Sequence, residues 1–215
     1  MTGVGARVTN MLIRYPDREA ASQAAAEIIS DCLQGQIGLQ ATATFVASGG
    51  KSPVRCFHYL SEKKLDWSRI YVTLSDERCV PADHQQSNQK LIRDNLIKGN
   101  AQTLAFLPLE EGNFCDKTPF ACSLLGMGND GHFASLFPDS PELKEGLVSQ
   151  KEVIEVSTPS SPFDRVSMTL NLIVKSNEIL LLVFGEDKLK VLENPSGLPV
   201  EELLSRFPVK IIWAP

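Results

Sequence analysis

Short apolar runs alternate along the chain with stretches whose apolar residues recur at helical spacing. The runs Thr42–Ala47, Ile70–Leu74 and Ile179–Phe184 consist mainly of β-branched and other apolar residues and predict strands. The third has no polar residue, a pattern typical of a strand buried on both faces of a parallel sheet. Further strands are expected at Leu104–Leu107, Ala121–Leu125, Val153–Val156, Val166–Leu170 and Val209–Trp213.

Helices are predicted between these strands. Asp17 is a suitable cap for a helix that runs to about Leu33. A second helix is expected to reach about Leu60, with Ser52 as its N-cap and Pro53 at its first position. Two more are expected at Ser87–Ile97 and Glu186–Leu192. This alternation predicts a single α/β domain over residues 1–215, a three-layer Rossmann-like fold with a mostly parallel central sheet flanked by helices.

The composition is that of an ordinary globular protein, with 43% hydrophobic and 22% charged residues among 215. A net charge of −5 disfavours nucleic acid or a membrane surface as the main partner. No apolar run is long enough to span a membrane, and the N-terminus lacks a basic-then-apolar signal pattern. The five cysteines show no CxxC spacing. We therefore expect reduced thiols in a cytoplasmic protein, with no metal bound through them.

A glycine-rich loop, Gly126–Pro138, follows the apolar run Ala121–Leu125 and presents Asp130 and His132. In an α/β sheet, ligands bind at the carboxyl ends of the strands. Glycines let a ligand approach the main chain closely, and an imidazole that titrates near neutral pH is suited to take a proton from water. The loop therefore predicts a catalytic base, and the alternative is a tight turn with an incidental histidine.

The segment Ser48–Pro53 follows another predicted strand and contains Gly49, Gly50 and Lys51. Two glycines before a helix expose backbone N–H groups, and the helix dipole favours an anion at that position. The glycine spacing is not that of a Walker loop, so the segment indicates either an anion site or a simple turn.

The charged triplet Asp76-Glu77-Arg78 lies just beyond the predicted strand Ile70–Leu74. A triplet of this kind is usually a solvated turn. Here the arginine can instead bind a phosphate or carboxylate in bidentate fashion. Asp76 is expected to hold that arginine or to accept hydrogen bonds from sugar hydroxyls, and Glu77 to cap or support the turn.

Arg165 and Lys188 also lie at element boundaries. A surface charge is the alternative for both, and for Lys188 it is the default interpretation. If these two residues converge with Lys51 and Arg78 at one end of the acidic molecule, they form a pocket for an anion.

Five segments in this order resemble the 6-phosphogluconolactonase family, and the resemblance covers most of the chain. The matching segments are Ser48–Pro53, Asp76–His84 with Ser87-Asn88, Leu124–Pro138, Arg165–Thr169 and Gly185–Lys188. The resemblance implies hydrolysis of 6-phospho-D-glucono-1,5-lactone to 6-phosphogluconate in the oxidative pentose phosphate pathway. The implied partner is a small phosphosugar lactone, and we expect a monomer or homodimer.

On this resemblance, His132 is a general base that activates water toward C1 of the lactone. Asp130 orients His132 or stabilises its loop. The substrate-binding residues are expected to be Gly49, Gly50, Lys51, Asp76, Arg78, Arg165 and Lys188. A lactone is an activated ester, so the mechanism requires no cofactor and no metal; positioning and base catalysis suffice.

Two alternative functions accompany this prediction. Sugar-phosphate deaminases of similar fold share the glycine-histidine block, but Phe137 replaces a carboxylate that ring opening would use, and Arg78 stands where they tend to carry a tyrosine. Both differences favour lactone hydrolysis. A non-catalytic phosphosugar-binding module is the second alternative; the acidic chain has no basic helix-turn-helix to accompany it, and a pure binder has less use for His132.

Overall fold

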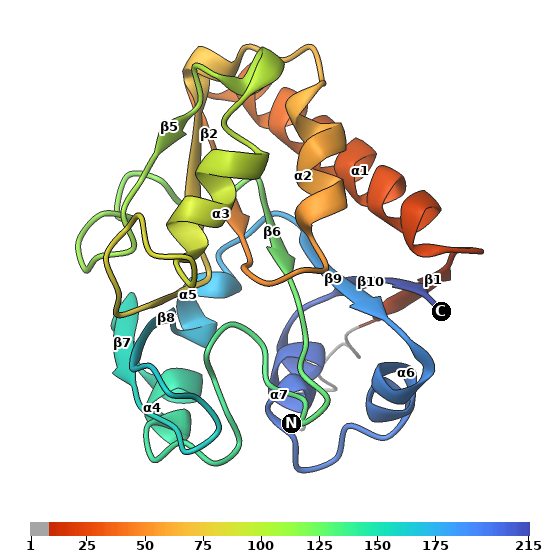
Figure 1. The fold of residues 1–215 in the computed structure, drawn as a ribbon, viewed down its shortest axis with the longest axis vertical. Coiled ribbons are helices and arrows are strands. Elements are labelled where there is room, and N and C mark those ends of the chain that lie inside the picture. Colours follow the sequence, from red (N-terminus) through yellow and green to blue (C-terminus); the bar gives the residue numbers. More distant parts are fainter. Residues whose placement is uncertain (1–8) are drawn as a thin grey trace, which may run out of the picture.

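The computed structural model describes residues 9–215; the first eight residues of the expected domain, and of the N-terminal pattern discussed above, lie outside that range. A seven-stranded sheet forms the centre, with α1 and α2 on one side and α6 and α7 on the other (Figure 1). Every strand pair in it is parallel. The predicted α/β fold with a mostly parallel sheet flanked by helices is confirmed.

The strand order of the large sheet is β1-β10-β9-β6-β2-β3-β5. Its strands are β1 (Met11–Arg14), β2 (Ala43–Ala47), β3 (Ile70–Leu74), β5 (Ala105–Phe106), β6 (Cys122–Leu125), β9 (Ile179–Phe184) and β10 (Val209–Ala214). The central strands β2, β6 and β9 are buried along almost their whole length. Their apolar side chains supply the core on both faces of the sheet, which is why these segments are mostly apolar; Thr44 and Ser123 are the polar side chains buried among them.

A second sheet of three antiparallel strands has the order β4-β8-β7. Its strands are β4 (Asp76–Arg78), β7 (Val153–Val156) and β8 (Arg165–Met168). The charged triplet 76–78 is therefore a strand and not a turn. It pairs with β8, a strand almost ninety positions later in the chain. This pairing depends on tertiary contacts, so it could not be predicted from the local sequence.

The helices of the described chain are α1 (Arg18–Leu39), α2 (Val54–Ser61), α3 (Asn88–Asn95), α4 (Leu143–Val148), α5 (Leu170–Ile173), α6 (Glu186–Glu193) and α7 (Pro199–Arg206). Asp17 caps α1 as predicted, and its carboxylate accepts a hydrogen bond from the backbone N–H of Ala20. None of these helices combines the length and the apolar character needed to cross a membrane.

The predicted start of α2 is wrong by one residue. Pro53 occupies the N-cap position, with φ −81° and ψ −7°, and no side chain caps the helix. Ser52 lies one position before the cap and lines a pocket instead. The N-terminal N–H groups of α2 therefore lack the side-chain cap that the sequence suggested.

Candidate active site

One pocket opens beside the ends of the central strands and collects side chains from both sheets. Every predicted site residue except Asp130 lines it. The lining residues are Ser48, Gly49, Gly50, Lys51, Ser52, Asp76, Arg78, Asn88, Gly126, Met127, Gly128, His132, Ala134, Arg165 and Lys188. The pocket thus brings together segments that are separated by up to 140 positions in the chain.

His132 lies on the loop after β6 and is held by Asp130. The imidazole Nδ1 and a carboxylate oxygen of Asp130 are 2.6 Å apart. Because an ionised carboxylate only accepts hydrogen bonds, this contact assigns the proton of a neutral imidazole to Nδ1 and leaves the lone pair on Nε2. The side chain of His132 is 27% exposed, so Nε2 belongs to a partly accessible base.

The glycines of this loop are needed for close packing. A Cβ at Gly128 would lie 2.3 Å from both the Asp130 carboxylate and the His132 ring, so no side chain fits there. Gly131 has φ +76°, a conformation that L-residues avoid, and its carbonyl accepts a hydrogen bond from Val200 at the start of α7. The glycine pattern therefore sets how close the acid and the base stand.

Phe137 belongs to the same loop and packs its ring against His132 from within the protein. Its ring centroid is 4.2 Å from that of His132, and the Arg165 guanidinium lies 5.2 Å from the ring centroid on the face of the ring. The side chain is almost completely buried. An apolar ring therefore occupies the position at which we expect the sugar-phosphate deaminases to carry a carboxylate.

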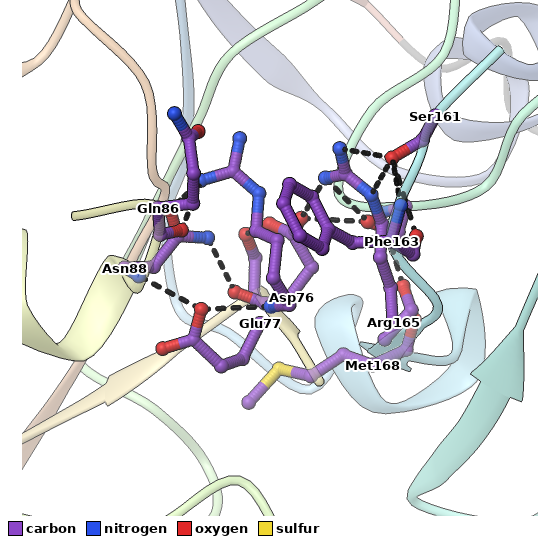
Figure 2. A network of polar contacts seen from close by, with 12 residues as sticks. Asp76, Glu77, Gln86, Asn88, Ser161, Phe163, Arg165 and Met168 are labelled. Atoms are coloured by element: carbon purple, nitrogen blue, oxygen red, sulfur yellow. Dashed lines mark hydrogen bonds and ion pairs between the residues drawn. The ribbon is translucent and has the colours of Figure 1, made fainter. Parts of the chain in front are cut away.

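Arg165 lies at the start of β8 and is anchored on two sides (Figure 2). Its Nε and Nη2 donate to Ser161 Oγ at 3.3 and 3.1 Å, and its Nη1 lies 3.5 Å from a carboxylate oxygen of Asp76. Burial lowers the pKa of the Arg165 guanidinium, and nearby Arg78 acts in the same direction while Asp76 opposes it. The side chain remains a cation because an arginine is not deprotonated in proteins.

Asp76 is a buried carboxylate beneath the pocket. It accepts hydrogen bonds from the hydroxyls of Ser135, at 2.6 Å, and Ser75, at 3.0 Å. The expectation that Asp76 holds Arg78 is wrong, because its partner is Arg165. The cause is the antiparallel pairing of β4 with β8, which sets Arg78 opposite Arg165 and leaves Asp76 on the diagonal to Arg165.

Arg78 is fixed by the segment that follows it. Its Nη1 donates to the carbonyl of Gln86 and to Asn88 Oδ1, both at 2.8 Å. Its Nε is buried and has no hydrogen-bond partner among the described residues. A guanidinium held at one nitrogen and unpaired at another is suited to receive an anion.

Lys188 lies in the first turn of α6, after Gly185 with φ +93°. Its side chain is half-buried, and burial lowers the pKa of its amine, with Asp130 opposing this shift. Lys188 therefore lines the pocket with a half-buried side chain, and a role in ligand binding stays a prediction. Lys51 is the more exposed cation of the pocket.

The charge balance of the pocket is positive although the chain as a whole is acidic. Four cations (Lys51, Arg78, Arg165 and Lys188) line it together with the carboxylate of Asp76. Within residues 9–215, no three His, Cys, Asp or Glu side chains gather as metal ligands would. The arrangement can bind an anionic ligand and present a base to it.

Known proteins match the chain over nearly its whole length. The family model for glucosamine-6-phosphate isomerases/6-phosphogluconolactonase matches residues 16–118 and 101–214. A 6-phosphogluconolactonase from Neisseria meningitidis is 35% identical over 197 residues, which cover 83% of this chain and 85% of the relative. One from Pseudomonas aeruginosa is 36% identical over 219 residues, covering 92% and 91% respectively.

The crystal structure of a 6-phosphogluconolactonase from Shewanella baltica superposes with a TM-score of 0.92 at 30% identity, covering 98% of this chain and 100% of that one. The chain belongs to the glucosamine-6-phosphate isomerase/6-phosphogluconolactonase family. The resemblance predicted from the order of five motifs is thus confirmed.

Sequence reasoning overlooked several pocket residues of this family member. Asn88 was noted only as part of a matching motif, and Ser48, Met127 and Ala134 received no role. The signal for Asn88 was its place directly after Ser87, a residue suited to cap a helix. Ser48, Met127 and Ala134 are uncharged, and nothing in their sequence positions indicated a place in the pocket.

Proposed function

We propose that this chain hydrolyses 6-phospho-D-glucono-1,5-lactone to 6-phospho-D-gluconate in the oxidative pentose phosphate pathway, in the cytoplasm. The observation that carries the proposal is a base with a free nitrogen, His132, in a pocket that four cations line. The names of the relatives support the same reaction. In the proposed complex, the ester carbon of the substrate lies near His132 and its phosphate lies among the four cations.

In the proposed reaction, His132 Nε2 removes a proton from a water molecule as its oxygen attacks C1 of the lactone. The carbonyl π electrons move onto oxygen and form a tetrahedral oxyanion. When this intermediate collapses, the bond from C1 to the ring oxygen breaks, and the imidazolium returns its proton to that oxygen. Asp130 stabilises the imidazolium through the Nδ1–H contact at 2.6 Å.

The cations and the glycine-rich segment of the pocket are proposed to hold the substrate. Lys51, Arg78 and Arg165 receive the 6-phosphate and ring hydroxyls, with Lys188 as a further cation. The backbone N–H groups of Gly49 and Gly50 donate to no group of the described chain, so they remain available to an anion. Because the ester is activated, base catalysis and positioning are sufficient without a cofactor.

The deciding experiment is a lactonase assay on freshly generated 6-phosphogluconolactone, corrected for spontaneous hydrolysis. We expect a clear acceleration that depends on enzyme concentration. A rate equal to the spontaneous one would contradict the proposal. Ammonia release from glucosamine 6-phosphate would then identify a deaminase, and thermal stabilisation by 6-phosphogluconate without turnover would identify a non-catalytic binding module.

A further inference from the structure

Asn88 lies where three segments of the pocket meet. It is the first residue of α3, and only 1% of its surface is exposed. Its Nδ2 donates to the backbone carbonyl of Asp76, and its Oδ1 accepts from Arg78 Nη1, both at 2.8 Å. These contacts fix the orientation of the amide, because the reverse orientation would place an NH₂ group against a guanidinium and an oxygen against a carbonyl.

The same amide packs against the glycine-rich segment. A Cβ built on Gly49 would lie 2.0 Å from Asn88 Oδ1, and its three nearest atoms all belong to the Asn88 side chain. The side chain of Asn88 is therefore the nearest obstacle to any side chain at position 49. One side chain thus touches the segment 48–52, the backbone of β4 and the guanidinium of Arg78.

The backbone of Asn88 is itself held firmly. The Glu77 carboxylate accepts a hydrogen bond from the N–H group of Asn88 at 2.7 Å (Figure 2). It also accepts hydrogen bonds from the N–H group of Gln89 at 2.7 Å and from the hydroxyl of Ser87 at 3.0 Å. Negative charge at the N-terminus of a helix is favourable. The start of α3 is therefore fastened to β4, one residue away from Arg78.

We propose that Asn88 is a positioning residue of this site: it aligns Arg78 with the segment 48–52 so that both meet the phosphorylated substrate together. This inference rests on the proposed function. Arg78 Nε is buried and has no hydrogen-bond partner among the described residues. The orientation of the guanidinium therefore depends on the contacts that its Nη1 makes. A pre-aligned guanidinium loses less conformational freedom when it binds an anion.

The first test compares Asn88→Ala with Asn95→Ala. Asn95 lies at the other end of α3 and has a similar pair of contacts, to His58 and to the carbonyl of Leu91, but it does not line the pocket. We expect Asn88→Ala to raise KM by about 10-fold with kcat changed less than about threefold, the pattern of lost binding common to ground and transition states. Asn95→Ala should leave both near wild type.

Equal effects of the two substitutions on KM, with equal losses of thermal stability, would overturn the proposal, because they would indicate a purely structural role. Asn88→Asp keeps the shape of the side chain and provides a second variant if Asn88→Ala folds poorly. Its carboxylate would neutralise Arg78 and face the Asp76 carbonyl, so we expect weaker substrate binding for this variant too. Unchanged KM in a folded Asn88→Asp would also count against the proposal.

The second test asks whether Asn88 acts through its neighbours. In an Arg78→Ala background, Asn88→Ala should raise KM by much less than it does in the wild type, because the partner is already missing. Gly49→Ala should be strongly damaging alone, and adding Asn88→Ala should restore the double variant to the level of Asn88→Ala, since that change removes the clashing atoms. Fully additive effects in both pairs would overturn the assignment.

The same variants are measured for the Kd of 6-phosphogluconate by calorimetry, which needs no turnover. If the wild type lacks lactonase activity but binds this compound, and Asn88→Ala weakens the binding about 10-fold while Asn95→Ala does not, the proposed function fails and the positioning role stands. If the wild type is active and Asn88→Ala alters neither KM nor Kd, the positioning role fails and the function stands.

Discussion

His132 is oriented by a residue only two positions earlier in the chain. The pairing with Asp130 is therefore local, and the glycines on either side allow the loop to bend tightly enough to make it. Asp130 and His132 therefore form one local unit. The cations that line the pocket come from other elements, so they meet this unit only in the folded protein.

We expect His132→Ala to lower kcat for the lactone by about 10²–10⁴-fold, the usual contribution of a positioned base. Asp130→Asn should cause a smaller loss, because the imidazole remains present but its tautomer and the developing imidazolium are less well stabilised. Steady-state kinetics, corrected for spontaneous hydrolysis, measure both. Near-wild-type turnover in His132→Ala would remove this residue from the mechanism.

We predict that Lys188 makes ligand affinity depend on pH in a defined direction. Burial lowers the pKa of its amine below the ordinary value of 10.5. An anionic ligand binds the protonated amine, so the Kd for 6-phosphogluconate should rise as the pH passes upward through the pKa of Lys188, at a pH below 10.5. Lys188→Arg should move that rise to higher pH, because arginine stays charged. Calorimetric titrations over a pH series measure the effect, and identical profiles for the two proteins would contradict it.

At the scale of elements, the pairing of β4 with β8 decides which charges meet. The register sets Arg78 opposite Arg165, so two guanidiniums stand together at one edge of the pocket. Like charges directly opposite each other destabilise a sheet. The unfavourable pairing is offset in part by Asp76, which lies 3.5 Å from Arg165 Nη1. We expect an anion bound between the two arginines to relieve the remaining repulsion.

Glu77 caps α3 from a strand that lies before it in the sequence. Its carboxylate accepts hydrogen bonds from the backbone of Arg78, Asn88 and Gln89. Glu77→Ala should lower the free energy of unfolding by about 1.5–3 kcal/mol, the range for hydrogen bonds to a charged group. Urea denaturation measures this change. The control is Glu110→Ala, because the Glu110 side chain is exposed and its carboxylate forms no hydrogen bond or ion pair with the described residues. This substitution should change the free energy of unfolding by less than about 0.5 kcal/mol.

A loss of equal size in the Glu110 variant would contradict the capping role of Glu77. Glu77 was expected to cap or support a turn after Ile70–Leu74, but it lies in strand β4 and its carboxylate caps α3. The helix that it caps could not be named from sequence, because α3 begins 11 residues after Glu77 and is brought back by the fold.

At the scale of the whole molecule, we propose that residues 1–215 fold as a single domain, as a monomer or homodimer. Apolar residues from every strand of the large sheet except β1 and β5 belong to one continuous core cluster. A core shared in this way should melt as one unit. The two tryptophans report on distant parts of it: Trp67 directly precedes β3, and Trp213 lies in β10.

We expect Trp67→Phe and Trp213→Phe, each with one remaining tryptophan, to unfold in a single urea transition. In each variant, tryptophan fluorescence and far-ultraviolet circular dichroism should give the same midpoint, because local and global unfolding coincide in a two-state protein. Midpoints that differ between the two probes within one variant would indicate separately folding parts. Light scattering after size exclusion measures the oligomeric state.

The amino-acid sequence by itself determined the strands of the large sheet other than β1, the cap of α1 and the charged residues that line the pocket. The apolar runs predicted Ile70–Leu74 and Ile179–Phe184 to the residue, because a strand buried on both faces is built mainly from apolar residues; Thr73 is a buried polar exception. The glycine-histidine loop could also be predicted from the sequence, because its contact between Asp130 and His132 joins residues only two positions apart.

Only the tertiary structure decided how the charged residues pair. Asp76 contacts Arg165 across 89 positions, and Asn88 joins Arg78 to Gly49, because the small antiparallel sheet and α3 fold back onto the ends of the central strands. Such contacts depend on the register of distant segments, and short-range periodicity carries no information about that register. The sequence therefore identified the charged residues that line the pocket, while the fold added Asn88 to them and determined which residues hold one another in place.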